Sequence, residues 1–378
     1  MIANTDLVRR MKLLRLSLLL VLCAALLPLA ACKKKEDAAA AGAAPTGEPP
    51  APEPPKEEPP VEFKASWPVG QRLVQRVETT TDTEGVNATT QQPFKLANTQ
   101  VQELAFTALK ARESGGHEVE IETLAISTTN RIGTNTTIFT SRSDPKQDAK
   151  NNFLAAPMRK LVGGKVKLLT TADGKVEKVE GGPQLRSKVT AGANMYVIAS
   201  LNNMLSDEAI KGWNTLHSGL PEQAVKPGDS WPFTRNQSFG PGTITMDATN
   251  TFKGWEQRDG RKVALIESAG VIVAKPPAGT SPVTVTVEDG ATTSGKAWFD
   301  PALGCIVEST TTSDFSIKMA FANGQSTASK AKVVANAKLT DAPNPGAATA
   351  EAKPAAPAPD AKPADAKPAK KPKTAEKP

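Results

Sequence analysis

Ser143 and Lys146 stand at the spacing of a Ser-x-x-Lys pattern, in which a lysine activates a nucleophilic serine. The chemistry needs both side chains on one helix. Pro145 lies between them, and proline removes a helix hydrogen bond and clashes with the preceding turn. No Lys-Thr-Gly sequence follows the pattern. The Ser-x-x-Lys pattern therefore does not indicate a serine enzyme.

Histidine chemistry is limited to His117 and His217. His117 follows Gly115 and Gly116 in an expected turn, and His217 ends an expected helix, so both are predicted to be solvated rather than to serve as bases or ligands. The sequence has no Cys/His spacing typical of zinc, no Gly-x-Ser-x-Gly elbow and no phosphate loop. We expect no enzymatic activity, no cofactor and no metal site.

Acidic residues are numerous but scattered. Glu118, Glu120 and Glu122 alternate with Val119 and Ile121, a pattern typical of a strand with one wet face. Carboxylates from distant strands can still converge in a hydrolase, so that function stays open as the weakest alternative.

Cys32 is the cysteine with the most informative surroundings. Four basic residues, Arg9, Arg10, Lys12 and Arg15, lie at the start of an apolar run over 13–27, and Leu29-Ala30-Ala31-Cys32 closes it. The run is shorter than the about 20 residues of a membrane-spanning helix. This segment resembles the lipobox of bacterial lipoproteins. The resemblance implies a signal peptide over residues 1–31 and a lipid anchor with palmitate on Cys32. An uncleaved anchor helix is the alternative.

The resemblance also implies a location. A lipoprotein lies in the cell envelope, and Lys33 after the cysteine favours the outer membrane, facing the periplasm. Cys23 would leave with the signal peptide and Cys32 would carry lipid, so Cys305 would be alone, without an intramolecular disulfide. Its apolar neighbours predict a buried, inert thiol.

Composition divides the rest of the chain into three parts. Residues 32–62 are a Pro/Ala/Glu linker and residues 342–378 an Ala/Lys/Pro tail, and neither can bury a core, so both are predicted to be disordered. The net charge of +7 lies mostly in the termini, so the weakly basic body implies no nucleic-acid surface. The basic tail could contact the cell wall or an envelope protein.

Strand patterns dominate the globular domain predicted over residues 63–341. Val283–Val287 and Phe315–Phe321 alternate cleanly, and Asp173-Gly174 marks a hairpin turn. A segment near residues 187–217 has helical spacing instead. We expect a mainly β (α+β) fold, a curved antiparallel sheet that is half-barrel or barrel-like, with one central helical segment. Trp67 and the other tryptophans are expected to anchor its core.

The two sides of that helical segment look alike. Residues 63–183 and 220–341 each open near a proline and a tryptophan, continue with a strand pair and end in a hairpin. The pattern favours an internal duplication, although alternating strands match one another easily.

A Pro/Gly opening (Pro68, Gly70), the hairpin over 171–176 and the segments Leu220-Pro221 and 225–231 carry a second resemblance. The layout is similar to an uncharacterised family of bacterial lipoproteins defined as a domain of unknown function. The resemblance carries no functional residue.

Two functions fit these features. The first is a non-enzymatic, membrane-anchored lipoprotein that binds or carries a hydrophobic ligand in an apolar concavity, by fold-level analogy with periplasmic lipid carriers. The alternative is a structural or protein-interaction scaffold tethered in the envelope. The sequence does not name the ligand or the partner.

Replacing Cys32 with serine tests the predicted lipid anchor. We expect Cys32→Ser to abolish metabolic labelling with a radioactive fatty acid and to leave uncut precursor, because the serine hydroxyl cannot replace the thiol that accepts the lipid. A variant that still matures and partitions into detergent would contradict the lipoprotein prediction.

Overall fold

The computed structural model describes residues 59–87, 90–149, 152–239, 242–275, 283–321 and 324–341. The predicted signal peptide, Cys32, nearly all of the linker and the tail lie outside these residues.

Strands make up most of the described chain. The first half contains β1 (Arg72–Val86), β2 (Pro93–Ala111), β3 (His117–Ile132), β4 (Asn135–Thr140), β5 (Lys165–Thr170) and β6 (Val176–Glu180). The second half contains β7 (Ser230–Phe239), β8 (Gly242–Arg258), β9 (Arg261–Lys275), β10 (Val283–Val287), β11 (Thr292–Asp300), β12 (Cys305–Phe321) and β13 (Ser326–Asp341).

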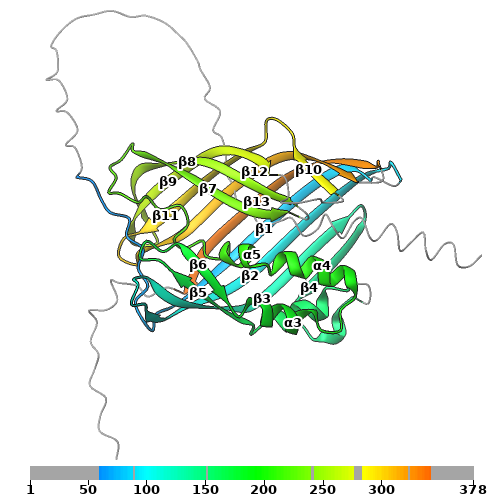
Figure 1. Ribbon diagram of the computed structural model, residues 1–378, viewed down its shortest axis with the longest axis horizontal. Coiled ribbons are helices and arrows are strands. Elements are labelled where there is room, and N and C mark those ends of the chain that lie inside the picture. The colour runs from blue at the N-terminus through cyan, green and yellow to red at the C-terminus, as the bar shows by residue number, and fades with distance from the viewer. Residues whose placement is uncertain are drawn as a thin grey trace, which may run out of the picture. The chain divides into compact units, whose positions relative to one another are not determined.

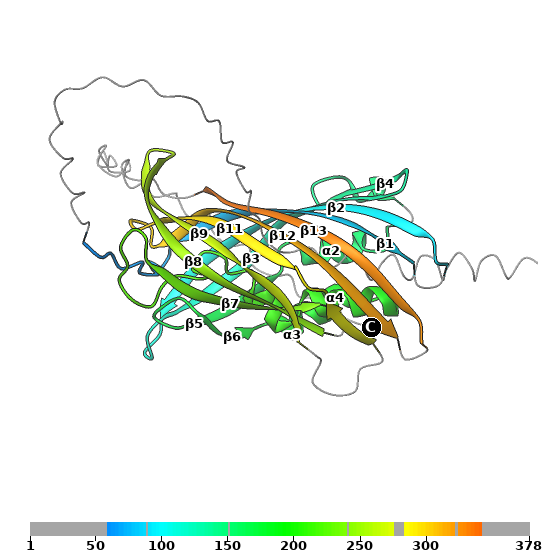
Figure 2. The same cartoon turned by 90° about the horizontal axis from the view of Figure 1, so that it is seen from above.

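These strands form one 13-stranded antiparallel sheet with the order β6-β5-β3-β2-β1-β13-β12-β11-β9-β8-β7, and β4 and β10 pair beside this path with β3 and β12. The sheet is not closed into a barrel, and β6 and β7 are its two edges. The predicted curved antiparallel sheet is confirmed, in its open form (Figures 1 and 2).

Twist and bulges explain the curvature. Long antiparallel strands twist right-handedly, and a bulge bends the strand that carries it. Register shifts occur in five strand pairs, for example between Phe252 and Gly254 where β8 pairs with β9. Gly254 has φ +129°, a conformation that side chains rarely adopt. The long strands therefore arch around one inner face (Figure 2).

Helices cover one end of that inner face (Figure 1). They are α2 (Ala155–Leu161), α3 (Gly182–Thr190), α4 (Met195–Met204) and α5 (Asp207–Lys211), with the short 3₁₀ helix η1 (Pro145–Gln147) before them. The predicted helical segment is confirmed as α3–α5, although α5 ends at Lys211 rather than near His217, and α2 was not predicted. No helix among the described residues is long and apolar enough to cross a membrane.

The helix-covered end holds the largest apolar cluster. Phe106 of β2, Ile121 of β3 and Leu168 of β5 pack against Leu185 of α3 and Leu201 of α4. Burying one such side chain stabilises the fold by about 1.5–3 kcal/mol.

The sheet itself covers the opposite end of its inner face. Phe315 and Ile317 of β12 pack with Met246 of β8, Ile272 of β9 and Val333 of β13. Phe315 and Ile317 are 3% and 2% exposed, Met319 is partly buried against the same cluster, and Lys318 is exposed. The predicted register of this strand is confirmed.

The predicted hairpins occupy equivalent places in the two halves. β2–β3 and β8–β9 each follow directly after the first strand of their half, and β5–β6 and β11–β12 follow after one short strand, β4 or β10. The duplication itself stays a prediction.

Removing the inward aromatic of β12 tests this core. Phe315→Ala should lower the free energy of unfolding by about 3–5 kcal/mol, because it deletes a buried ring and leaves a cavity. The control Lys318→Ala removes an exposed side chain three residues away and should change the free energy of unfolding by less than about 0.5 kcal/mol. Urea denaturation followed by tryptophan fluorescence measures both. A larger loss for Lys318→Ala would contradict the register.

Candidate functional site

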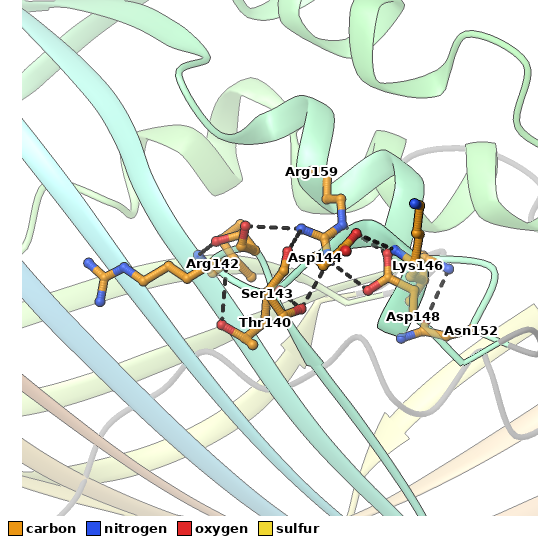
Figure 3. Close-up of polar contacts among 11 residues, drawn as sticks. Thr140, Arg142, Ser143, Asp144, Lys146, Asp148, Asn152 and Arg159 are labelled. Atoms are coloured by element: carbon orange, nitrogen blue, oxygen red, sulfur yellow. Dashed lines mark hydrogen bonds and ion pairs between the residues drawn. The ribbon is translucent and has the colours of Figure 1, made fainter.

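The Ser-x-x-Lys segment lies at the start of η1, in a loop that Arg159 of α2 organises (Figure 3). The Arg159 guanidinium donates to both oxygens of Asp148, at 2.8 and 2.7 Å, and to the carbonyls of Ser141 and Ser143, at 3.0 and 2.9 Å. These charge-assisted bonds hold the pKa of Asp148 below its usual range. Arg159 thereby ties the loop to the helix.

Within that loop Ser143 has no catalytic partner among the described residues. Its hydroxyl donates to the Thr140 carbonyl at 2.9 Å and accepts from Arg159 at 3.1 Å. Lys146 is exposed, and its backbone N–H donates to Asp144. These contacts are those of a structural loop.

His217 is buried, and the prediction that it is solvated is wrong. Its side chain is 4% exposed, and its ring lies 4.6 Å from the Trp67 ring, centre to centre. The segment after α5 enters the molecule instead of ending at its surface, which carries His217 between the turns at Gly174 and Gly304. Burial lowers the pKa of His217 to about 4.

Two other predictions about reactive groups are confirmed. Cys305 is fully buried, and burial raises the pKa of its thiol to about 12, so the thiolate is absent at neutral pH. The three glutamates of β3 lie on the outer face, where Glu118 and Glu120 pair with Lys167 and Lys165 at 3.0 and 2.8 Å. They form a solvated ion-pair network and not a paired-carboxylate site.

The middle of the inner face carries many polar side chains beside its apolar ones. Between the two apolar ends, the inward positions of seven strands carry hydroxyl and amide side chains, which we name the polar belt: Thr79, Thr81, Asn98, Gln100, Thr128, Asn130, Asn250, Ser268, Thr293, Ser309, Thr311 and Ser313. Several bond to each other, such as Ser313 to Thr293 at 3.0 Å and Ser268 to Asn250 at 2.6 Å.

The chain after α5 crosses this face as an internal strut over residues 212–220. The Gly219 carbonyl accepts from Trp231 and from Asn250, each at 2.9 Å. Thr215 donates to Gln75 of β1 at 2.9 Å, and the Leu216 carbonyl accepts from the backbone of Ile306 at 2.8 Å. The strut thus joins strands from both halves of the sheet.

A pocket of about 70 Å³ lies between the strut and the polar belt. Thr215, Ser218 and Gly219 of the strut form one wall, and inward residues of β7, β8, β9, β11 and β12 form the others. The lining contains no carboxylate, histidine or cysteine. It includes Arg235 of β7, whose Nη2 donates to the Gly212 carbonyl at 2.9 Å. This arrangement can hold a polar group by hydrogen bonds.

The family described as "Family of unknown function (DUF6263)" matches residues 116–306, half of the chain. The chain belongs to this family. The match begins next to β3 and ends in β12, so it includes the pocket walls from β7, β8, β9 and β11 and the whole strut. The predicted membership of an uncharacterised family is confirmed. A search of curated proteins finds none similar in sequence to this DUF6263 protein.

Solved structures give only distant likenesses to the DUF6263 protein. Lipovitellin, in a structure titled for its lipid–protein interactions, has a TM-score of 0.38 at 7% identity over 73% of this chain and 26% of its own. DynF from Micromonospora chersina has a TM-score of 0.19 at 7% identity, over 78% of this chain and 92% of its own. An outer membrane channel from Pseudomonas putida F1 has a TM-score of 0.17 at 7% identity, over 75% of this chain and 100% of its own. The chain spans about a quarter of lipovitellin, and these scores carry no argument.

Sequence reasoning missed the pocket and its Arg235. The polar walls of the pocket come from Thr- and Ser-rich strands, which the sequence analysis interpreted only as strands with one wet face. The alternation was visible, but the side of the sheet that faces inward was not.

The buried histidine predicts a pH dependence. The unfolded chain binds a proton on His217 near pH 6.5, whereas the folded chain binds it only near pH 4. The stability that neutral His217 contributes is therefore complete above pH 6.5 and is lost as the pH falls toward 4, by about 3 kcal/mol. Thermal unfolding between pH 7 and 4 should show a smaller decline for His217→Gln. The control His117→Gln, at a partly exposed site where burial also lowers the pKa, should remove a smaller part of the decline than His217→Gln does. Equal slopes in all three proteins would contradict this assignment.

Proposed function

We propose that this DUF6263 protein is a non-enzymatic ligand-binding lipoprotein of the bacterial envelope, anchored by lipid on Cys32 at the outer membrane and facing the periplasm. The observation that carries the proposal is the pocket on the inner face of an open sheet, between the polar belt and the strut.

The surroundings of the pocket favour an amphiphilic ligand. Met246 belongs to the apolar cluster of Phe315 and Ile317, at the end of the inner face away from the helices. Ile266 and Ile306 belong to a second cluster, around Phe252 and Phe299. All three line the pocket, while hydroxyls of the belt and strut line it as well. A ligand with one polar and one apolar part would find partners for both.

The size of the pocket limits what it holds. Pockets for whole drug-sized ligands measure about 300–1,000 Å³, and this one measures about 70 Å³. It would seat the polar part of a ligand, and the rest would lie against the apolar walls or displace them.

A matched pair on β12 tests this function. Thr311 points inward and lines the pocket, whereas Thr312 points to the outer face of the same strand. The mature chain from residue 32 onward, with Cys32→Ser to omit the lipid, is titrated calorimetrically with dodecanol, and its organic extract is analysed for co-purified amphiphiles. Thr311→Phe should weaken dodecanol binding at least tenfold, because the ring fills the pocket, and Thr312→Phe should leave it unchanged.

Absence of dodecanol binding and of any extracted amphiphile in the wild type would contradict the ligand-binding function. Equal dodecanol binding by both variants would show that the ligand binds outside this pocket.

The scaffold alternative has one specific feature in its favour. Each edge of the open sheet presents backbone groups that a partner strand could pair with, and β7 is ten residues long. Crosslinking in cells would then capture an envelope protein, and deletion of residues 342–378 would weaken the capture. Recovery of monomer alone from both proteins would contradict this alternative.

A further inference from the structure

Arg235 is placed unusually for a positive charge. It lies on the inner face of the edge strand β7, opposite Met246 in register, and it lines the pocket. One of its five N–H donors is used, by the Gly212 carbonyl at 2.9 Å. The remaining donors have no protein acceptor among the described residues.

Other arginines that are partly buried, as Arg235 is, have carboxylate partners. Arg159 pairs with Asp148 at 2.7 Å, Arg261 with Asp300 at 2.9 Å, and Arg112 with Glu177 at 2.5 Å. Within the described part of the chain, no carboxylate lies at salt-bridge distance from Arg235. Burial lowers the pKa of Arg235 to about 10, with no neighbouring charge to oppose the shift.

A shielded, unpaired charge is costly for a protein that gains nothing from it. Bonding the Gly212 carbonyl does not require a cation, since a neutral donor or water would satisfy it. Lys296 also lines the pocket, but its ammonium pairs with Glu267 at 2.9 Å. Arg235 thus gives the pocket a net positive charge with four donors available.

We propose that Arg235 binds the anionic headgroup of an amphiphile, a carboxylate or a phosphate, in this pocket. The proposal rests on the proposed ligand-binding function and names the class of ligand. A guanidinium matches carboxylate and phosphate oxygens with two parallel N–H bonds, and it does so most strongly where water is excluded.

The other pocket residues complement such a headgroup. Ser309 and Thr311 present hydroxyls with no protein hydrogen bond among the described residues, and they can donate to the remaining anion oxygens. Phe233 and Met246 flank Arg235 along β7 and β8, where the first carbons of an apolar chain would lie. A free inorganic anion would leave these apolar contacts unused.

Four probes of matched structure test the proposal on the same mature chain: dodecanoate, dodecyl phosphate, dodecanol and inorganic phosphate. The wild type should bind dodecanoate or dodecyl phosphate about tenfold or more tightly than dodecanol, as expected for a hydrogen bond to a charged group. Inorganic phosphate should bind much more weakly than dodecyl phosphate. Calorimetry at fixed salt measures all four.

Two variants locate the effect. Arg235→Gln should abolish the preference for the anionic probes, and the control Lys318→Gln, which changes an exposed cation outside the pocket, should retain the preference. Arg235→Lys keeps a charge and should retain part of it. Far-UV circular dichroism checks that each variant folds. If Arg235→Gln fails to fold, the wild-type comparison of dodecanoate with dodecanol still decides.

The outcomes separate the two proposals. Equal wild-type affinity for dodecanol and the anionic probes overturns the role of Arg235 and leaves the binding function standing. An unchanged preference in a folded Arg235→Gln variant overturns it as well. Inorganic phosphate binding as tightly as dodecyl phosphate overturns the amphiphile as the ligand. Failure of every dodecyl probe to bind contradicts the proposed function itself.

Discussion

An open antiparallel sheet must shield its inner face from water along the whole length of its strands, and this constraint organises the molecule. The described helices shield one end, where Phe106 and Leu168 meet α3 and α4. At the other end the sheet arches onto itself, so that Phe315 of β12 packs with Met246 of β8. Neither the helices nor the arching sheet covers the middle of the inner face. There the inward side chains include hydroxyls and amides that bond to one another and to the strut.

The strut makes this arrangement possible because it approaches the sheet more closely than a helix can. Its His217 packs beside Gly174, where an added Cβ would lie 2.9 Å from the histidine Cβ, and against Gly304, where an added Cβ would lie 2.3 Å from Ser66 outside the strut. Both glycines also have positive φ, so only glycine fits these turns. A neutral, buried histidine follows from the same packing, and so does the pocket that remains beside Gly219.

Two arginines show how differently the fold treats a partly buried charge. Arg159 has its guanidinium surrounded by a carboxylate, two carbonyls and a hydroxyl, and it fixes a loop. Arg235 has a single carbonyl and faces a pocket. The first arrangement is complete in the protein alone, whereas the second gains its partner from a ligand under the function proposed above. This difference in pairing makes the pocket, and not the Ser-x-x-Lys loop, the candidate site.

The sequence by itself determined the local elements. Period-two alternation predicted β10 and the register of Phe315 and Ile317, Asp173-Gly174 predicted the β5–β6 turn, and the apolar surroundings of Cys305 predicted its burial, because these signals depend only on neighbouring residues. The tertiary structure decided which polar strand faces are enclosed. Thr311 and Arg235 look like surface residues in an alternating strand, and His217 looks like a helix end. Only the curl of the sheet and the path of the strut bring them inside, since burial is set by what packs across a face and not by the residues along it.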